Sequence, residues 1–131
     1  IKKTYLAVVE GTLPKKAILK DKILKDEKLN KVFISDKGKD ASLDYEVVKY
    51  NEEINMSVVK VNLHTGRHHQ IRVQFASRNH SLSGDQKYGT RGRGKQLALW
   101  AYSLTFTHPT LKEEMTFEYY PEITGSWKIL E

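Results

Sequence analysis

Residues 64–75 read His64-Thr65-Gly66-Arg67-His68-His69-Gln70-Ile71-Arg72-Val73-Gln74-Phe75. Four of the five histidines lie between positions 64 and 80, and all five arginines lie between positions 67 and 93, whereas the lysines are spread along the whole chain. Arginine offers a rigid, permanently charged fork that suits phosphates and carboxylates, whereas lysine often serves solubility alone. The stretch and the residues after it therefore gather the side chains best suited to binding an anion.

The positive charge of the chain is concentrated around this stretch. Residues 54–112 carry nine basic side chains and one acidic side chain, Asp85, which gives this segment a net charge of +8. The rest of the chain carries thirteen basic and fifteen acidic side chains, so the +6 of the whole chain comes from its middle. A pI near 9.4 favours an anionic partner, most commonly nucleic acid, and the alternative is a solvated basic face.

The secondary structure of residues 66–78 is ambiguous from the pattern. Alternating apolar and polar residues suit a strand, whereas Ile71 and Phe75 share one face of a helix. Thr65 can accept a hydrogen bond from the first-turn amides, and Asn79 suits a left-handed stop, so we predict a helix that begins just after Thr65. The free amides and positive dipole end of that helix would then favour an anion beyond the preceding strand.

Alternating apolar residues on both sides of this stretch predict β-strands. An antiparallel hairpin is expected from strands at 41–47 and 59–63, joined by a polar turn at 51–53. The other expected elements are short strands at 5–9, 17–24 and 32–34, a glycine-punctuated basic loop at 81–95, a strongly alternating strand at 98–106, an alternating run at 115–119 and a helical segment after Pro121. The predicted class is α+β, with a mainly antiparallel mixed sheet and few helices, and residues 1–131 are expected to form a single domain.

The composition excludes several other classes. The 131 residues suit one domain, no apolar run is long enough to cross a bilayer, and no segment resembles a signal peptide, so we predict a cytoplasmic protein without a membrane partner. There is no cysteine, which excludes disulfides and thiolate metal sites. The sequence also has neither a Gly-x-Ser-x-Gly elbow nor a glycine-rich loop ending in Lys-Ser/Thr, which argues against a serine hydrolase and a nucleotide hydrolase.

Two kinds of site can be considered for the middle of the chain. Histidines 64, 68 and 69 could bind a metal, but a third ligand is not apparent and the surrounding positive charge repels a cation, so no metal is predicted. Arg67 and Arg72 could instead contact phosphates, or one of them could hold a carboxylate in a salt bridge. Spacing alone leaves the functional and structural roles of this arginine pair equally open.

Five motifs in a fixed order span nearly the whole chain: Lys3-Thr4-Tyr5-Leu6-Ala7-Val8-Val9-Glu10-Gly11, Thr65-Gly66-Arg67-His68-His69-Gln70-Ile71-Arg72, Gly84-Asp85-Gln86-Lys87-Tyr88-Gly89, Leu97-Ala98-Leu99-Trp100-Ala101, and Leu104-Thr105-Phe106-Thr107-His108-Pro109. As an ordered set, these motifs resemble those of the RluA-type RNA pseudouridine synthases. The resemblance implies isomerisation of uridine in rRNA or tRNA without a cofactor. The base is detached from C1′ of its ribose, rotated and rejoined through C5.

The resemblance also implies roles for individual residues. Tyr5 matches a tyrosine that lies against the flipped uracil and can handle the C5 proton, and Arg72 matches an arginine that pairs with the catalytic aspartate. Asp85 is expected to stabilise a turn beside Gly84 rather than to act as a nucleophile. The predicted RNA contacts are Arg67, His69, Gln70, Arg78, Lys87, Arg91 and Arg93. For His69 and Gln70, hydrogen bonding between strand and helix is the structural alternative.

One part of the family pattern is missing. The nucleophilic aspartate of the family lies in a His-Arg-Leu-Asp stretch followed by Thr-Ser-Gly, upstream of the position of Tyr5, and this chain starts at Ile1 without such a stretch. We therefore expect the C-terminal portion of a pseudouridine synthase catalytic domain, inactive alone. The alternative is a noncatalytic RNA-binding module on the same scaffold. The sequence indicates neither the target uridine nor the oligomeric state.

Overall fold

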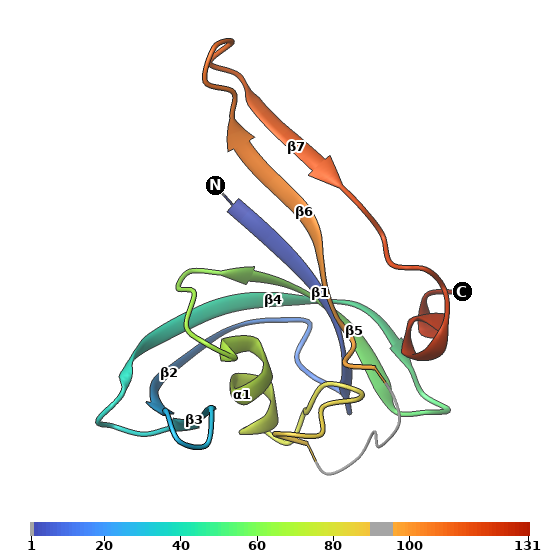
Figure 1. Ribbon diagram of the computed structural model, residues 1–131. Helices are drawn as coiled ribbons and strands as arrows, with labels where there is room; N and C mark the ends of the chain where they lie inside the picture. Colours follow the sequence, from blue (N-terminus) through green and yellow to red (C-terminus); the bar gives the residue numbers. More distant parts are fainter. Residues whose placement is uncertain (1, 90–95) are drawn as a thin grey trace.

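A computed structural model describes residues 2–89 and 96–131 as one seven-stranded sheet with a short α-helix and a 3₁₀ helix (Figure 1). The strands lie in the order β3-β2-β4-β5-β1-β6-β7. The elements are β1 (Lys2–Glu10), β2 (Lys16–Asp26), β3 (Lys31–Ile34), β4 (Lys39–Asn51), β5 (Met56–Leu63), α1 (Gln70–Ala76), β6 (Leu99–Thr107), β7 (Glu114–Glu118) and η1 (Gly125–Leu130). Each predicted strand, the β4–β5 hairpin and the α+β class are confirmed. The expectation of a mainly antiparallel sheet is also confirmed, and every pairing between the described strands is antiparallel.

Strand β1 lies in the interior of the sheet, between β5 and β6. Leu6 to Val9 are all buried, because Ala7 and Val9 pack in the layer under α1 while Leu6 and Val8 pack in a second layer with η1. A strand covered on both faces needs apolar side chains at successive positions rather than at alternate ones. This explains why the first motif of the chain reads as a continuous apolar run.

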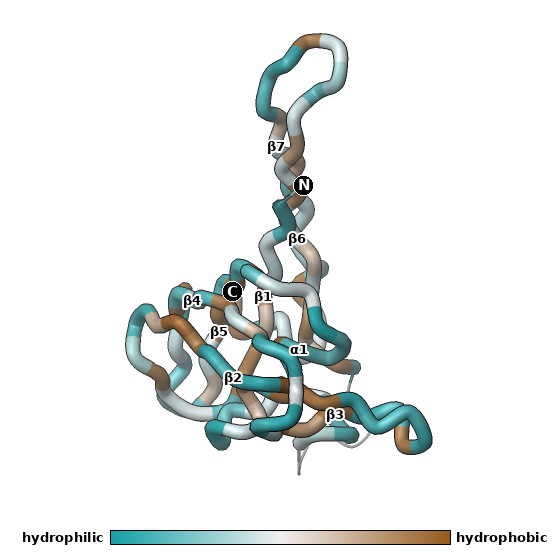
Figure 2. Tube along the Cα trace, turned by 90° about the vertical axis from the view of Figure 1, so that its left-hand side faces the viewer, coloured by the Kyte–Doolittle hydropathy of each residue, from teal (hydrophilic) through white to brown (hydrophobic). Residues whose placement is uncertain are grey.

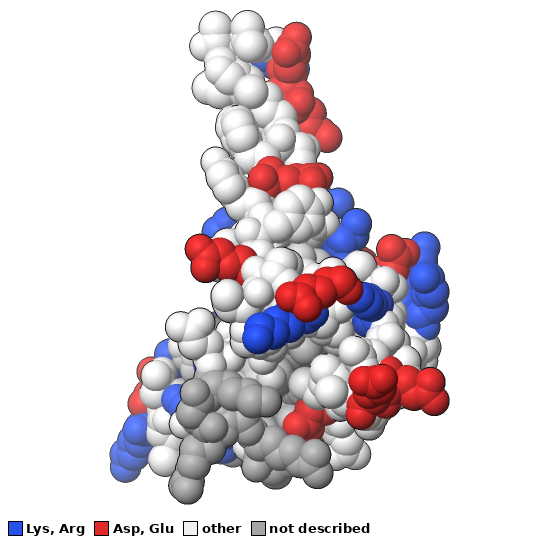
Figure 3. All heavy atoms as spheres, turned by 90° about the vertical axis from the view of Figure 1, so that its right-hand side faces the viewer, with Lys and Arg blue, Asp and Glu red and all other residues white. Residues whose placement is uncertain are grey.

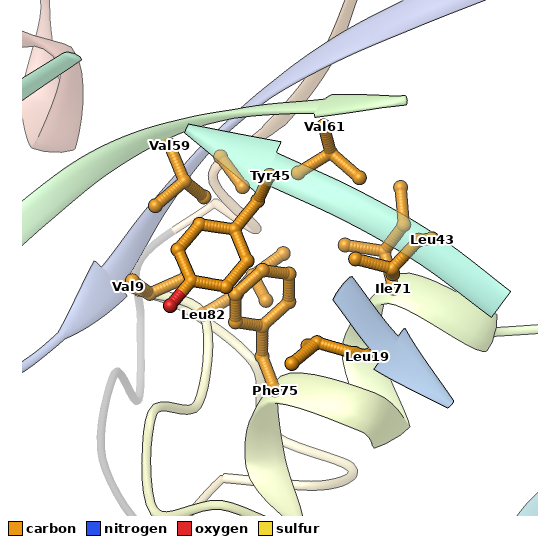
Figure 4. Packing of buried hydrophobic residues seen from close by; sticks show 10 residues of the cluster. Val9, Leu19, Leu43, Tyr45, Val59, Val61, Ile71, Phe75 and Leu82 are labelled. Carbon is orange, nitrogen blue, oxygen red and sulfur yellow. The ribbon is translucent and has the colours of Figure 1, made fainter. Parts of the chain in front are cut away.

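The larger core lies between α1 and one face of the sheet (Figure 4). Phe75 of α1 is fully buried and meets the ring of Tyr45 edge to face, with 5.5 Å between the centroids. The rest of the cluster comes from β1, β2, β4, β5, α1 and the segment after it: Ala7, Val9, Leu19, Leu43, Val59, Val61, Ile71 and Leu82. The α1 helix is therefore anchored on the sheet, and its Val73 packs in a further buried cluster with Tyr88 of the following loop.

The start of α1 differs from the prediction. The helix begins at Gln70, and its N-cap, His69, has a left-handed backbone with φ of 51°. The Thr65 hydroxyl does not cap the helix, because it donates to Gln70 Oε1 and accepts the backbone N–H of Ser42. The expected left-handed stop is confirmed, since Asn79 has φ of 64°. With seven residues and this irregular entry, α1 does not offer the row of free amides expected for an anion site.

The loop after α1 is partly built into the core. Residues 81–85 are buried, and Leu82 bridges to Val9 of β1, so this half of the predicted surface loop packs against the sheet. Gly84 has φ of 81°, and a Cβ added there would lie 2.1 Å from the carbonyl oxygen of Gln96. Only glycine fits this close backbone approach, which turns the chain so that the next residue, Asp85, points inward.

Strands β6 and β7 form a hairpin whose end stands away from the rest of the molecule (Figures 1 and 2). Phe106 and Phe117 stack within the hairpin, with 5.8 Å between their ring centroids. Acidic side chains lie along one side of it (Figure 3). Over the described part of the chain, no helix is both long and apolar enough to span a membrane.

Candidate functional site

The central feature of the site is an ion pair between Arg72 of α1 and Asp85 of the following loop. Arg72 Nε donates to Asp85 Oδ2 at 3.0 Å and Nη2 donates to Oδ1 at 2.9 Å, which is the bidentate geometry. Asp85 is 0% exposed and also accepts the backbone N–H groups of Lys87 and Tyr88. The predicted turn-stabilising role of Asp85 is confirmed, and the ion pair adds a second role that the sequence pattern did not indicate.

Both partners of this pair are charged. Burial acts to raise the pKa of Asp85, but the hydrogen bonds from Arg72 and from the Tyr88 amide outweigh it, so the pKa lies below its ordinary value. The hydrogen bond to Asp85 in turn raises the pKa of Arg72. The Arg72 side chain is still 18% exposed, and its Nη1 has no hydrogen-bond partner among the described residues. A guanidinium has five N–H donors, so Arg72 can bind a second anion at its remaining edge.

Tyr88 connects three parts of the site. Its hydroxyl accepts the backbone N–H of Val32 at 3.0 Å and lies 2.7 Å from Nδ1 of His69. Its ring centroid lies 5.1 Å from Cζ of Arg72 and 5.4 Å from Nζ of Lys31, both within the range of a cation–π contact. Burial raises the pKa of the Tyr88 phenol, so it keeps its proton at neutral pH. Tyr88 thus joins β3, α1 and the loop after α1.

His69 is neutral at physiological pH. Its pKa is lowered to about 4, first by burial and then by the positive charges of Arg72, His68 and Lys87, with Asp85 acting in the opposite direction. The ring stacks on His68 at 3.8 Å between centroids. Apart from the contact of Nδ1 with Tyr88, the imidazole makes no hydrogen bond to a described residue. His69 therefore has one ring nitrogen available for a ligand.

Gln70 and Arg67 hold the entry to α1 in place. Gln70 is 2% exposed, and its side chain accepts from the Thr65 hydroxyl and the Arg67 amide while donating to the carbonyl oxygen of Ser42. This corrects the predicted RNA contact for Gln70 in favour of the structural alternative, because its polar atoms already have partners inside the protein. Arg67 Nε donates to the Asp40 carbonyl oxygen at 2.9 Å, so Arg67 and Arg72 hold separate partners. Arg67 is exposed and can still reach a ligand.

The other predicted RNA contacts occupy different places. Arg78 forms a bidentate pair with Asp21 of β2 and also donates to the Gln74 carbonyl oxygen, which ties the end of α1 to the sheet. Lys87 lies in the loop of Asp85 and donates from Nζ to the Asn30 carbonyl oxygen. Arg91 and Arg93 lie outside the described residues. Of the two that the structure describes, Lys87 lies in the loop that carries Asp85, whereas Arg78 faces Asp21.

Tyr5 lies on β1, half-buried against the core that holds Ile71 and Phe75. Its hydroxyl makes no hydrogen bond to a described residue. The face of the sheet that carries Tyr5 is the one covered by α1, and α1 is the element that carries Arg72. The two predicted catalytic residues therefore belong to the same layer of the molecule.

The three histidines of the metal alternative do not converge. His64 hydrogen bonds through Nε2 to Asp44 Oδ2 at 2.6 Å and through Nδ1 to the Ser42 hydroxyl at 2.8 Å, away from the stacked pair His68 and His69. In residues 2–89 and 96–131, no group of three or more His, Cys, Asp or Glu side chains is arranged to hold a metal ion. His64 and His69 serve as hydrogen-bonding groups, whereas His68 stacks on His69.

A protein-family model described as RNA pseudouridylate synthase matches residues 1–77, which include Tyr5, Arg67, His69 and Arg72. The chain belongs to the RNA pseudouridylate synthase family. The matched segment ends before Asp85 and Tyr88, so the ion pair joins a residue inside the segment to one outside it.

Curated proteins similar to the chain are also pseudouridine synthases. An "Uncharacterized RNA pseudouridine synthase" of Aquifex aeolicus is 41% identical over 96 residues, which cover 66% of this chain and 30% of that protein. A "Ribosomal large subunit pseudouridine synthase D" of Neisseria meningitidis is 32% identical over 133 aligned positions, covering 90% of this chain and 35% of that protein. "Dual-specificity RNA pseudouridine synthase RluA" of Escherichia coli is 39% identical over 84 residues, which cover 62% of this chain and 38% of that protein. The RluA-type resemblance is thus confirmed, and the chain spans about a third of the length of these relatives.

Two solved structures share the fold of this pseudouridylate synthase family member. Human RNA Pseudouridylate Synthase Domain Containing 1 aligns with a TM-score of 0.81 at 23% identity, over 96% of this chain and 57% of that chain. Human RNA Pseudouridylate Synthase Domain Containing 4 aligns with a TM-score of 0.72 at 19% identity, over 98% and 60%. Both comparisons support the fold observed here.

Sequence reasoning missed two members of the site. Asp85 is thirteen residues beyond its partner Arg72, and Tyr88 is nineteen residues beyond His69. No helical or strand periodicity connects positions in different elements at such spacings. The available signal was the tight Gly84–Gly89 segment, in which the one acidic residue of the basic middle and an aromatic residue lie between two glycines.

Proposed function

We propose that the protein to which this chain belongs isomerises uridine to pseudouridine in RNA, with Arg72 and Tyr5 as catalytic residues of this chain. The observation that carries the proposal is the Arg72–Asp85 pair, which fixes a guanidinium in the family-matching part of the molecule and leaves one of its edges unoccupied by described residues. A fixed cation is the group needed to hold an attacking carboxylate ionised and oriented. The nucleophilic aspartate predicted from the family pattern lies in a preceding segment.

The proposed steps follow from these positions. The aspartate attacks the target nucleotide, the bond between the base and C1′ breaks, and the uracil turns and is rejoined to C1′ through C5. The carboxylate leaves as C5 bonds to C1′. Tyr5, which lies against the flipped uracil, handles the proton that C5 loses, and N1, freed from the ribose, ends with a proton, so no hydrogen is gained or lost overall. The reaction needs no redox step, because product and substrate are isomers. This agrees with the prediction that no cofactor takes part.

The substrate class is proposed to be rRNA or tRNA, in line with the name of the Neisseria relative and with the charge of this chain. Arg67 and Lys87 flank Arg72 as exposed or partly exposed cations and are the best placed of the described residues to contact phosphates. Arg78, Arg91 and Arg93 stay predicted RNA contacts. The cytoplasmic location predicted from the sequence belongs to the same proposal.

The test is release of tritium from RNA labelled with [5-³H]uridine by the intact cellular protein that carries this chain. Arg72→Ala should lower kcat by about 100-fold or more, because it removes the charge that holds the carboxylate. Arg72→Lys should recover only part of the rate, since an ammonium cannot bind two carboxylates through a planar fork. Tyr5→Phe should lower kcat while leaving RNA affinity nearly unchanged.

Tyr50→Phe is the matched control, because the Tyr50 hydroxyl bonds only Asn55 at the exposed β4–β5 turn. Full activity of Arg72→Ala would contradict its catalytic role. RNA binding by the intact protein without any tritium release, from rRNA or from tRNA, would favour the noncatalytic RNA-binding module instead.

A further inference from the structure

We propose that Tyr88 is a positioning residue that fixes His69 as a neutral imidazole with its proton on Nε2, so that Nε2–H donates a hydrogen bond to bound RNA. The identity of the ligand rests on the proposed function, whereas the state of the imidazole does not. Tyr88 lies in the Gly84–Gly89 motif, beyond the residues 1–77 that the family model matches.

The hydrogen bonds of the Tyr88 hydroxyl determine where the protons lie. The backbone N–H of Val32 can only donate, so the Tyr88 oxygen accepts it. The single hydroxyl proton then needs an acceptor, and Nδ1 of His69, at 2.7 Å, is the one that the described residues supply. If Nδ1 carried a proton instead, the Tyr88 hydroxyl would have no described group to donate to. The arrangement therefore favours an unprotonated Nδ1 and a protonated Nε2.

The charged groups around the ring support the neutral form. Arg72 faces His69 from α1, His68 lies beside it, Lys87 approaches from the loop, and Lys31 lies over the Tyr88 ring from β3. Asp85 acts in the opposite direction, but it is already held by the guanidinium of α1. If the imidazole of His69 took up a proton, its positive charge would be repelled by most of the neighbouring groups. His69 can thus donate from Nε2 without changing charge near neutral pH.

The backbone of His69 gives an independent reason to assign a task to its side chain. With φ of 51°, His69 occupies the left-handed region at the N-cap of α1, where glycine or asparagine would be more comfortable. A non-glycine residue in this region is strained, and such strained residues cluster at functional sites. The imidazole of His69 makes no side-chain capping hydrogen bond, and it belongs to none of the hydrophobic core clusters. The contact with Tyr88 and an outward donor are what the side chain provides.

The experiment combines imidazole NMR with RNA binding on the ¹⁵N-labelled 131-residue chain. The chain contains a reference for each tautomer. His80 Nδ1 donates to the Glu10 carbonyl oxygen, whereas His108 Nδ1 accepts the backbone N–H groups of Thr110 and Leu111. Long-range ¹H–¹⁵N spectra should show His69 in the same Nε2–H form as His108, without titration between pH 8 and 5. In Tyr88→Phe, which keeps the ring under Arg72, His69 should sample both tautomers and titrate at a higher pH than in the wild type.

RNA binding is measured with a fluorescent stem-loop RNA that carries uridines in its loop. His69→Leu should weaken binding about 3- to 10-fold, as expected for one lost hydrogen bond. His69→Gln, which places a neutral amide donor at a similar reach, should recover most of the affinity. The matched controls are His108→Gln and Tyr50→Phe, which change the same residue types in turns away from α1 and should bind like the wild type.

The outcomes are separable. An Nδ1–H tautomer, or a wild-type titration near pH 6.5, would overturn the proposal whatever the protein does to RNA. Wild-type RNA affinity in His69→Leu would overturn the recognition role even with the expected tautomer. The expected NMR result together with the loss in His69→Leu and the recovery in His69→Gln would support it. If the intact protein releases no tritium while the NMR and RNA-binding results are as expected, the proposed enzymatic function is wrong and the proposal for Tyr88 and His69 still holds.

Discussion

At the scale of single residues, the site depends on one buried carboxylate. Asp85 is the one acidic residue in the basic middle of the chain, and the fold buries it completely against Arg72. A buried carboxylate needs a charged partner and further hydrogen-bond donors, and Asp85 has both, in Arg72 and in two backbone amides. The same contacts that stabilise Asp85 leave Arg72 with a fixed orientation.

Asp85→Ala should lower the free energy of unfolding by about 3 kcal/mol, because it leaves a partly buried guanidinium without its partner. The change is measured by urea denaturation of the chain, followed by circular dichroism. Glu46→Ala is the control, since Glu46 forms an ion pair with Lys16 on the exposed surface. Exposed pairs of this kind contribute little to stability, because water and salt screen the two charges. Equal losses in the two variants would contradict the structural role of Asp85.

His69 should make the stability depend on pH. Its folded-state pKa of about 4 lies below the ordinary histidine value of 6.5, so the unfolded chain binds the additional proton as the pH falls. The stability from the neutral imidazole is complete above pH 6.5 and is lost progressively toward pH 4. We expect the free energy of unfolding to fall by about 1 kcal/mol between pH 6.5 and 5.

The check is a comparison of wild type with His69→Asn across this pH range. Asparagine tolerates the left-handed backbone of position 69 and does not titrate, so this variant should lack the His69 part of the slope. The other four histidines are common to both proteins, and the difference between the two curves isolates His69. Parallel curves would mean that the pKa of His69 is not lowered in the folded state.

The sequence predicted an arginine and a tyrosine for the site but not their surroundings. Arg72 and Tyr5 follow from motif positions, whereas the roles of Gln70 and Thr65 depend on a backbone turn that places both against Ser42 of another strand. That turn contains a left-handed backbone conformation at His69, which sequence pattern and propensity do not predict. Contacts between distant segments decide these residues, and such contacts are not visible in local periodicity.

At the scale of elements, the strands were predictable and the helix only in part. Alternation in the sequence predicted β4, β5 and β6, and burial alternates clearly in β4, whereas β5 has successive buried residues. The continuous run of β1 indicated a strand covered on both sides. Helix α1 has just seven residues, too few for a clear helical period. Its stability must come from packing against the sheet.

Phe75→Ala should therefore lower the free energy of unfolding by more than the change in helix propensity alone would. Phe75 is fully buried between α1 and Tyr45, and removing its ring leaves a cavity that the sheet cannot close. The free energy of unfolding should fall by about 3 to 5 kcal/mol, measured by chemical denaturation. Phe117→Ala is the matched control on the protruding hairpin, where the ring is 42% exposed, and it should cost much less. A similar cost for both would contradict the assignment of Phe75 to the main core.

At the scale of the whole molecule, charge is distributed unevenly. The side of the β6–β7 hairpin visible in Figure 3 carries acidic side chains, whereas Arg67, Arg72 and Lys87 surround the entry to α1. RNA is expected to contact the region of α1 rather than the end of the hairpin. The net charge of the sequence indicated an anionic partner, whereas the fold shows which cations also hold protein groups, such as Arg78 with Asp21.

RNA affinity should fall with salt, and single substitutions should show which cations contribute. Each neutralised phosphate of a single strand adds about −0.7 to the slope of log K against log salt. Lys87→Ala should make the slope shallower by roughly that amount. Lys16→Ala, which removes an exposed lysine paired with Glu46, should leave the slope unchanged. The measurement is RNA binding by fluorescence anisotropy from low to moderate salt, and equal effects of both substitutions would contradict the proposed surface.

The position of β1 between β5 and β6 has a consequence for biosynthesis. β1 is the earliest strand of this chain, yet its two partners begin at Met56 and Leu99. During translation, the apolar run Leu6–Val9 therefore has no strand partner until β5 has been made, and one of its edges stays open until β6 follows. An apolar strand with an open edge can pair with another chain, which makes residues 6–9 a natural binding site for a nascent-chain chaperone.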